Sequence, residues 1–274
     1  MEDNVSGYVH GYDPQESARL HDQAATLEPL LHSDISYPDG SKVLEAGCGV
    51  GAQTIPLARN SPGARITSVD ISAASLAEAR ARAEAAGVAN VAFLQADILD
   101  LPFAAESFDH IFLCFTLEHL PRPLDALCAL KPLLRAGGTI TVIEGDHGSA
   151  CLHPESEAAR AAIGALVELQ RAAGGDPHIG RRLYPLISGA GYSRVRVSPR
   201  LLYVDGSRPD LAEGFTRRTF AAMVEGVRDA AVEAGLIELD QFEEGLRALD
   251  RAAQPDGVFC YTFFKAVAER DPAT

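Results

Sequence analysis

The sequence predicts an α/β fold in which a doubly wound parallel sheet occupies residues 41–146. Short runs rich in valine, isoleucine and leucine alternate there with helical patterns, and a glycine-rich turn follows the first run. Strands that read as continuous apolar runs, separated by helices, are typical of a parallel sheet covered on both faces. Ligands of such sheets bind at the carboxyl ends of the strands, so the residues that follow each strand are the candidates for function.

The expected strands and helices alternate along this segment. A strand over 42–46 leads through the glycine turn into a helix that ends near residue 59. Ser72 is a suitable N-cap for the second helix, and Gly87 lies just past its end. A third helix, over 123–135, leads through two glycines into the fifth strand. The later strands are expected at 64–69 (ending on Asp70), 91–95, 110–115 and 139–144.

Further segments flank this core. Residues 1–40 contain an amphipathic helix, expected over 14–32, which could act as a lid or simply complete the core. The stretches 147–190 and 205–254 read as helical insertions of a substrate lid. The last strands are expected within 191–204 and 255–268. No linker rich in Pro, Gly or Ser marks a boundary, so residues 1–274 are expected to form a single domain.

Composition and charge limit the classes of function. The chain has 274 residues, 47% of them hydrophobic, and a net charge of −14 from 24 basic and 38 acidic residues. An acidic surface repels phosphate backbones, so nucleic acid is not the expected partner. No apolar run of membrane-spanning length and no secretory leader occur, which makes a cytoplasmic protein without a membrane partner the expectation. Five cysteines without pairing motifs read as free thiols, and no metal-ligand spacing occurs.

The strongest local signal is the glycine loop, which is contained in Val43-Leu44-Glu45-Ala46-Gly47-Cys48-Gly49-Val50-Gly51. Glycines let the backbone turn sharply and approach a ligand where a Cβ would stand in the way. A loop of this kind also occurs in NAD-binding proteins, whose spacing is GxGxxG rather than the GxGxG found here. The loop alone is therefore weak evidence for a ligand, because it could also be a structural strand–helix turn in some other doubly wound protein.

Two carboxylates that follow neighbouring strands indicate which ligand the glycine loop binds. Asp70 ends the second strand, 19 residues after Gly51, where a carboxylate can accept hydrogen bonds from both hydroxyls of a ribose. Asp97 follows the third strand, where it can accept from an adenine amino group. Because the carboxyl ends of parallel strands meet at one edge, these groups together predict a pocket for an adenosyl ligand and favour it over a dinucleotide.

The order of these motifs resembles that of the class I S-adenosylmethionine-dependent methyltransferases, in particular the ubiquinone/menaquinone-biosynthesis-like group. The resemblance covers residues 40–145, including LPF and FDHI within 101–111 and LKPLLRAGGTITV at 130–142. Other segments resemble one microbial subgroup of this family, and the resemblance fixes no substrate. These segments are YVHGY at 8–12, EGDHGS at 144–149, IGRR at 179–182 and CYTFFK at 260–265.

The resemblance implies a Rossmann-like, seven-stranded sheet with six parallel strands and one antiparallel strand, and S-adenosylmethionine as cofactor. It also implies roles for individual residues. Glu45 and Gly47 would line the methionyl end of the cofactor. Asp70 would hold the ribose, and Ile71 would pack on adenine. The remaining cofactor-binding residues would be Gly49 and Gly51 through their backbone, Cys48 as a small filler, Gln53 at the mouth of the loop, Asp97 and the Ile98 backbone at the adenine edge, the Phe115 carbonyl at the methionyl ammonium, and Tyr12, which could fold over the cofactor.

A catalytic base is needed only when the acceptor must lose a proton, because the methyl carbon of a sulfonium is already activated. His147, after the fifth strand, is the candidate base, and a role as a hydrogen-bonding loop residue is equally compatible with the sequence. His119 is expected to be structural. Several aromatic residues could belong either to the core or to an acceptor pocket, and the sequence does not divide them: Phe215, Phe220, Phe259, Tyr261, Phe263 and Phe264.

The sequence therefore predicts an enzyme that transfers a methyl group to O, N, S or C of a small organic acceptor and releases S-adenosylhomocysteine. The transfer would be an in-line displacement. Two alternatives stay open. One is a methyltransferase of a protein, or less favourably of an RNA, and the other is a non-methylating protein that binds an adenosyl ligand. A homodimer is compatible with the sequence, which does not reveal the acceptor.

Overall fold

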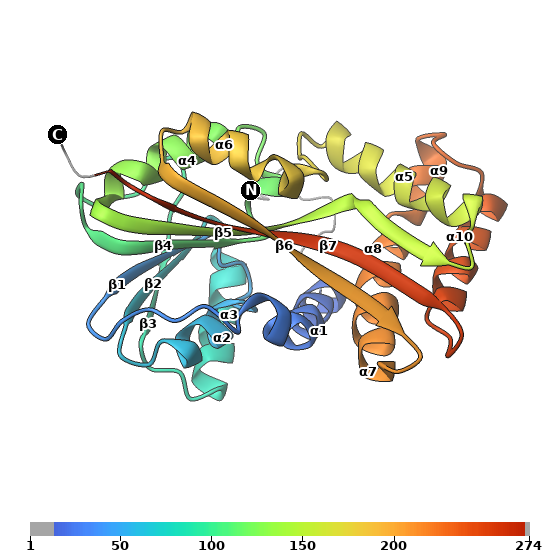
Figure 1. Ribbon diagram of the computed structural model, residues 1–274, viewed down its shortest axis with the longest axis horizontal. Helices are drawn as coiled ribbons and strands as arrows, with labels where there is room; N and C mark the ends of the chain where they lie inside the picture. The colour runs from blue at the N-terminus through green and yellow to red at the C-terminus, as the bar shows by residue number, and fades with distance from the viewer. Residues whose placement is uncertain (1–13, 272–274) are drawn as a thin grey trace. The chain divides into compact units, whose positions relative to one another are not determined.

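The computed structural model describes residues 14–271 (Figure 1). Its strands are β1 (Lys42–Ala46), β2 (Arg65–Asp70), β3 (Val91–Gln95), β4 (Phe108–Cys114), β5 (Leu134–His153), β6 (Ser193–Asp205) and β7 (Val258–Glu269). They form one sheet in the order β3-β2-β1-β4-β5-β7-β6. Neighbouring strands from β3 to β5 pair in parallel, whereas β7 is antiparallel. The predicted seven-stranded α/β fold is thereby confirmed.

The chain divides into two compact units. One unit, called the core unit below, comprises the described residues 28–145, 179–200 and 264–271. The other, called the second unit, comprises the described residues 14–27, 146–178 and 201–263. Four boundaries between the units fall inside β5, β6, β7 and the first helix, α1 (Pro14–Leu31), and the fifth lies between residues 178 and 179.

Helices cover both faces of the sheet in the core unit. Figure 1 shows α2 (Thr54–Asn60) and α3 (Ala73–Ala85) on one face, and α4 (Pro123–Leu130) and α6 (Leu183–Gly189) on the other. The Ser72 hydroxyl accepts a hydrogen bond from the Ser75 amide at 3.2 Å, so the predicted N-cap of α3 is confirmed. The unit also contains three short 3₁₀ helices: η1 (Leu117–His119), η2 (Lys131–Leu133) and η3 (Ile179–Arg182).

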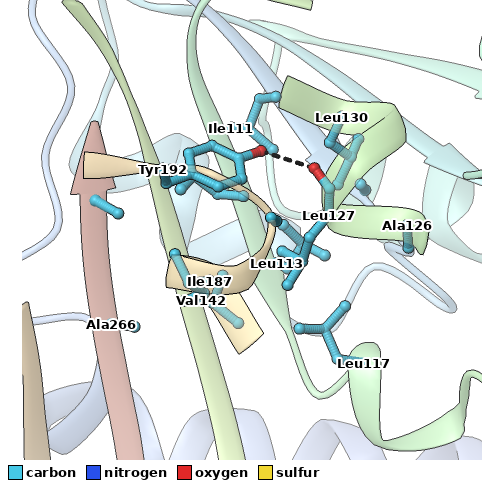
Figure 2. Close-up of a cluster of buried hydrophobic side chains, with 14 of the residues drawn as sticks. Ile111, Leu113, Leu117, Ala126, Leu127, Leu130, Val142, Ile187, Tyr192 and Ala266 are labelled. Atoms are coloured by element: carbon cyan, nitrogen blue, oxygen red, sulfur yellow. Dashed lines mark hydrogen bonds between the residues drawn. The ribbon is translucent and has the colours of Figure 1, made fainter. Parts of the chain in front are cut away.

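The hydrophobic core of this unit lies against the face that carries α4 and α6. The fully buried Ile111 and Leu113 of β4 pack there with leucines of α4 (Figure 2). Tyr192 is buried in the same cluster, and its hydroxyl donates a hydrogen bond to the Leu127 carbonyl at 3.1 Å. Burial of one such aliphatic side chain contributes about 1.5–3 kcal/mol, so this cluster stabilises the strands whose carboxyl ends carry the candidate site.

The second unit is mainly helical. Its helix α5 (Glu157–Ala172) packs against α10 (Leu239–Ala252). The shorter helices are α7 (Pro209–Leu211), the π-helix η4 (Ala212–Ala221), α8 (Ala222–Glu225) and α9 (Arg228–Glu233). Five of the six undivided aromatic residues are buried in this unit: Phe215, Phe220, Phe259, Tyr261 and Phe263. The sixth, Phe264, packs against the hydrophobic cluster of the core unit.

The fifth strand is longer at both ends than the sequence predicts. It begins at Leu134, because the third predicted helix ends at Leu130 and a 3₁₀ turn follows. The Gly137 amide donates to the Arg270 carbonyl at 2.8 Å, and the Arg270 amide donates to the Gly138 carbonyl at 2.9 Å. Pairing with a distant segment thus keeps the two glycines in the strand. Residues 147–153 continue the strand to His153 and are not helical, which corrects the start of the predicted lid insertion at 147.

The structure bears on the expectations about membrane-spanning helices, free thiols and metal sites. No helix within residues 14–271 is both long enough and apolar enough to cross a bilayer. The five cysteines are free thiols. Across the same described residues, no three or more His, Cys, Asp or Glu side chains are arranged to hold a metal ion. The cellular compartment and the homodimer stay predictions.

Candidate functional site

The glycine loop between β1 and α2 adopts a backbone that requires glycine. Gly47, Gly49 and Gly51 have φ values of +79°, +51° and +77°. A Cβ on Gly47 would lie 2.4 Å from Cγ2 of Thr116, and a Cβ on Gly51 would lie 2.9 Å from Cβ of Ala79. A Cβ on Gly49 would meet nothing within 4 Å. The loop is therefore packed at its two ends, and its middle faces open space that a ligand could fill.

Asp70 is joined directly to this loop. Its Oδ2 accepts a hydrogen bond from the Gly49 amide at 2.7 Å, and its Oδ1 accepts one from the Ser72 amide at 2.9 Å. The side chain is only partly buried. An ionised carboxylate offers about four lone-pair sites, so two hydrogen bonds leave it able to accept two more. The geometry is compatible with a diol ligand in addition to the backbone amides.

The ends of β2 and β3 bring the adenine-binding candidates to the same edge of the sheet. Asp70 of β2 is in register with Gln95 of β3, and the Ala96 amide donates to the Asp70 carbonyl at 3.0 Å. Ile71 is 49% exposed, which leaves an apolar surface next to the Asp70 carboxylate. Asp97 is exposed, and its Oδ1 accepts a hydrogen bond from the Leu99 amide at 2.9 Å. Ile98 follows Asp97, is partly buried and packs against the hydrophobic cluster.

Glu45, by contrast, is buried beneath the loop. Its Oε2 accepts hydrogen bonds from the Ser68 hydroxyl at 2.6 Å and the Thr54 hydroxyl at 2.7 Å. Burial raises the pKa of this carboxyl group to about 7, and the nearby charge of Asp70 adds to the increase. In this arrangement Glu45 links β1 to β2 and α2. Cys48 is also buried, and burial raises the pKa of its thiol, as suits a small filler between glycines.

Gln53 lies inside the protein and contacts a histidine that the sequence did not single out. Its Oε1 lies 2.7 Å from Nε2 of His32, and both side chains are buried. His32 also packs against Phe112, with ring centroids 5.7 Å apart. Burial lowers the pKa of His32, which favours the neutral ring, and a ring protonated at Nε2 donates to the Gln53 oxygen. The contact ties the segment after α1 to the start of α2.

The end of β4 contains an unusual backbone conformation. Phe115 has a φ of +56°, a left-handed value that is uncommon for a residue with a side chain. Its amide donates to the Ile143 carbonyl of β5 at 2.9 Å. The next two amides donate to a buried carboxyl group, that of Glu144. His119 lies in η1, with Nε2 3.7 Å from Oε1 of Glu118, which is compatible with the structural role expected for it.

The candidate base lies on β5 in the second unit. His147 is 6% exposed, and its Nδ1 lies 2.8 Å from the Tyr261 hydroxyl. Its ring also meets that of Phe220 edge-on, with the centroids 6.2 Å apart. Tyr12, the remaining candidate, and Tyr8 lie outside the described residues.

A family model described as a methyltransferase domain matches residues 43–138, the segment that carries the glycine loop, Asp70, Asp97 and Phe115. This segment is therefore similar to a methyltransferase domain. Over 152 residues, the chain is 36% identical to the ubiquinone/menaquinone biosynthesis C-methyltransferase UbiE of Paracoccus denitrificans. That similarity covers 52% of this chain and 61% of the relative, so the chain spans less than two thirds of the relative's length.

Solved structures resemble a larger part of the chain than residues 43–138 alone. A putative methyltransferase from Bacillus halodurans has a TM-score of 0.58 and 15% identity, over 90% of this chain and 99% of that one. The [4+2]-cyclase SpnF has a TM-score of 0.53 and 18% identity, over 98% of this chain and 88% of that one. At these identities the likeness shows the fold, and proteins of different activity share it.

Several residues of the site were not predicted from the sequence. Glu144, Thr116 and His32 each make hydrogen-bonding contacts beside the carboxyl edge. An acidic residue directly after the apolar run of the fifth strand was the available signal for Glu144. Nothing in the local sequence indicates that His32 pairs with Gln53, because the two residues belong to different elements.

Proposed function

We propose that the chain is an S-adenosylmethionine-dependent methyltransferase that acts on a small organic acceptor. The single observation that supports the donor best is the carboxylate of Asp70, held 2.7 Å from the Gly49 amide and followed by the exposed Ile71. A carboxylate beside an open glycine backbone, with an apolar surface next to it, suits a ribose and an adenine ring.

The residues present fit the donor on steric grounds as well. The loop is filled at Gly47 and Gly51 but open at Gly49, where a side chain would occupy the space offered to the ligand. In the proposed arrangement Asp70 holds the ribose, Ile71 packs on adenine, and Asp97 with the Ile98 backbone reads the adenine edge. The Phe115 carbonyl holds the methionyl ammonium, and the backbone from Gly47 to Gly51 lies beneath the methionyl end. Glu45 and Gln53 hold the elements next to this loop through the buried contacts described above, and the Cys48 thiol lies 3.8 Å from the Gly49 carbonyl oxygen within the loop.

The donor supplies a methyl group on a sulfonium, a carbon already activated for displacement. The protein's task is then to bind donor and acceptor in line and to exclude water. Where the acceptor must lose a proton, we propose His147 as the base. Its Nδ1 contact with the Tyr261 hydroxyl would fix the ring and its tautomer, as the partners of catalytic histidines do.

A small acceptor is supported by two observations. The C-methyltransferase UbiE is named for ubiquinone and menaquinone biosynthesis, and its similarity here covers 52% of the chain. The net charge of −14 disfavours RNA as acceptor. A protein acceptor is the alternative within the same chemistry.

The second candidate function is a non-methylating protein that binds an adenosyl ligand. It is favoured by one observation, the fold shared with a [4+2]-cyclase over 98% of this chain. Such a protein would retain the cofactor-binding loop and carboxylates but would leave the sulfonium intact.

Transfer of a labelled methyl group tests both candidates. The protein is incubated with methyl-labelled S-adenosylmethionine and a cell extract, and the products are separated by size. Label in small molecules, absent with Asp70→Ala, is the expected result. Label only in large molecules would replace the small acceptor by a protein or an RNA, and no transfer despite measurable binding would favour the non-methylating alternative.

A further inference from the structure

We propose that Glu144 is a positioning residue of the cofactor site, because its buried carboxyl group fixes the turn after β4 and, through that turn, both the Phe115 carbonyl and the glycine loop. The inference rests on the proposed function, since it concerns the affinity of the adenosyl site. Glu144 itself lies outside the set of residues expected to touch the cofactor.

The carboxyl group of Glu144 contacts the turn directly. Glu144 is 0% exposed. Its Oε1 accepts hydrogen bonds from the Leu117 amide at 2.7 Å and the Thr116 amide at 3.1 Å. The backbone amide of Glu118 contributes a further hydrogen bond. These amides begin the short helix η1, where a helix has no carbonyl partner for its first N–H groups. One side chain therefore satisfies the start of that helix.

The turn contains a residue, Phe115, in an unfavourable backbone conformation. Phe115 has a φ of +56°, and such a conformation costs about 1–3 kcal/mol and persists only where its surroundings determine it. On one side, the Phe115 amide is fixed by the Ile143 carbonyl of β5 at 2.9 Å. On the other side, the following amides are fixed by Glu144, the residue next to Ile143. The direction of the Phe115 carbonyl is thus set from both sides by β5.

Thr116 connects the turn to the glycine loop. The Thr116 hydroxyl lies 3.3 Å from the carbonyl oxygens of both Ala46 and Gly47. Its methyl group occupies the space where a Cβ on Gly47 would be placed, at 2.4 Å. Movement of Thr116 would therefore remove a hydrogen-bonding partner and a packing partner of the loop at the same time. Glu144 positions Thr116 by holding its amide.

Complete burial, with the Glu118 carboxyl nearby, raises the pKa of Glu144 well above its usual value, which favours the neutral form of the group. Its Oε2 is buried and has no hydrogen-bond partner among residues 14–271. A neutral carboxyl group that accepts through one oxygen can be replaced by an amide, which offers the same oxygen in the same place.

The experiment compares three variants by calorimetric titration with S-adenosylhomocysteine and by thermal unfolding. Glu144→Ala removes the acceptor, Glu144→Gln retains it, and Ser61→Ala is the matched control. Ser61 is also 0% exposed and accepts a hydrogen bond from a backbone amide, that of Tyr37 at 3.0 Å, but it follows α2, away from the carboxyl ends of the strands. Glu144→Ala is expected to weaken binding by about tenfold or more, and Glu144→Gln by less than about threefold. Ser61→Ala is expected to lower Tm without a change in Kd.

A second measurement does not depend on the cofactor. Amide hydrogen exchange of the ligand-free protein should become faster in Glu144→Ala within peptides that contain 115–118 and 47–49, with no such local effect in Ser61→Ala. If the wild type binds no adenosyl ligand, the proposed function fails, whereas this exchange pattern still tests the positioning. Unchanged exchange in both peptides would overturn the inference. Wild-type affinity in Glu144→Ala, or equal losses in the Gln and Ala variants, would overturn it as well.

Discussion

Oδ2 of Asp70 lies 2.7 Å from the Gly49 amide nitrogen, and this hydrogen bond joins the end of β2 to the middle of the glycine loop. The other oxygen of the same carboxylate accepts from the Ser72 amide at 2.9 Å, next to the start of α3. The side chain proposed to hold the ribose therefore also shapes the loop beside it. A site organised in this way before binding loses less conformational entropy when the ligand arrives.

The first prediction concerns the close approach at Gly47. Gly47→Ala combines a φ of +79° with a Cβ placed 2.4 Å from the Thr116 methyl group. Gly40→Ala is a matched control, because its φ is +80° but its Cβ would meet nothing within 4 Å. Gly40→Ala should destabilise by about 1–2 kcal/mol through backbone strain alone. Gly47→Ala should cost at least about 1 kcal/mol more through overpacking and should weaken adenosyl binding. Urea unfolding measures the difference, and equal losses would contradict the close packing.

The second prediction concerns the pH dependence of stability through Glu45. Burial raises the pKa of this carboxyl group from 4.5 to about 7. A raised folded-state pKa means that the contribution to stability is fully present below pH 4.5 and is lost as the pH rises through about 7. The loss is at most about 3–4 kcal/mol, at 1.36 kcal/mol per pKa unit.

Glu45→Gln supplies the reference for that measurement, because an amide does not titrate. The free energy of unfolding of the wild type should fall relative to Glu45→Gln between pH 4.5 and about 7, and the difference should then level off. Glu144 is present in both proteins, so its own titration cancels. A difference that stays constant over this range would show that the Glu45 carboxyl group titrates normally.

The third prediction concerns an ion pair beside the sheet of the core unit. The Asp34 carboxylate accepts a hydrogen bond from Nζ of the buried Lys265 at 2.8 Å. Its other oxygen accepts one from an Nη atom of Arg200 at 2.5 Å. Asp34→Asn leaves the Lys265 charge buried without its counter-charge. Because the Asp34 side chain is itself half exposed, the expected loss is about 1–3 kcal/mol rather than the larger cost of breaking a fully buried pair.

The double variant Asp34→Asn/Lys265→Met is the control for this pair. Removal of both charges should restore part of the stability, and a double-mutant cycle on thermal unfolding measures the coupling. Additive losses would contradict a direct interaction between the two side chains.

The fourth prediction concerns the proposed base. His147→Asn should lower the rate of methyl transfer by about 10²-fold for an acceptor that must lose a proton. The Kd for S-adenosylhomocysteine should stay unchanged, since His147 is not among the proposed cofactor contacts. Tyr261→Phe removes the hydroxyl that lies 2.8 Å from Nδ1 and should shift the pH profile of the reaction in the same assay. An unchanged rate in His147→Asn would leave this histidine a structural role only.

The regular part of the fold was predictable because its signals are local. The apolar run and glycine turn at Val43–Gly51, and the Ser72 cap of α3, each depend on neighbours within a few residues. The extent of β5 was not predictable, because Gly137 and Gly138 read locally as a turn and are kept in the strand by pairing with Arg270. Sequence patterns carry little information about such long-range pairing.

The residues of the candidate site also differ in whether their positions could be predicted from the sequence. Asp70 and Asp97 follow apolar runs, so their positions at the carboxyl edge could be read from the sequence. The burial of Glu45 and Gln53 could not, since it depends on Ser68 and His32 from other elements. The left-handed Phe115 also gives no sequence signal, because its conformation is imposed by the contacts of β4 with β5.

The most direct test of the central claim is calorimetric titration of the wild type and Asp70→Ala with S-adenosylmethionine, S-adenosylhomocysteine and NAD. Asp39→Ala, which removes an exposed carboxylate just before β1, controls for the change in net charge. Wild type and control should bind both adenosyl ligands and not NAD, and Asp70→Ala should bind them about 10- to 100-fold more weakly, as the loss of hydrogen bonds to a charged group predicts. Absence of adenosyl binding in the wild type, or binding of NAD in its place, would contradict the account.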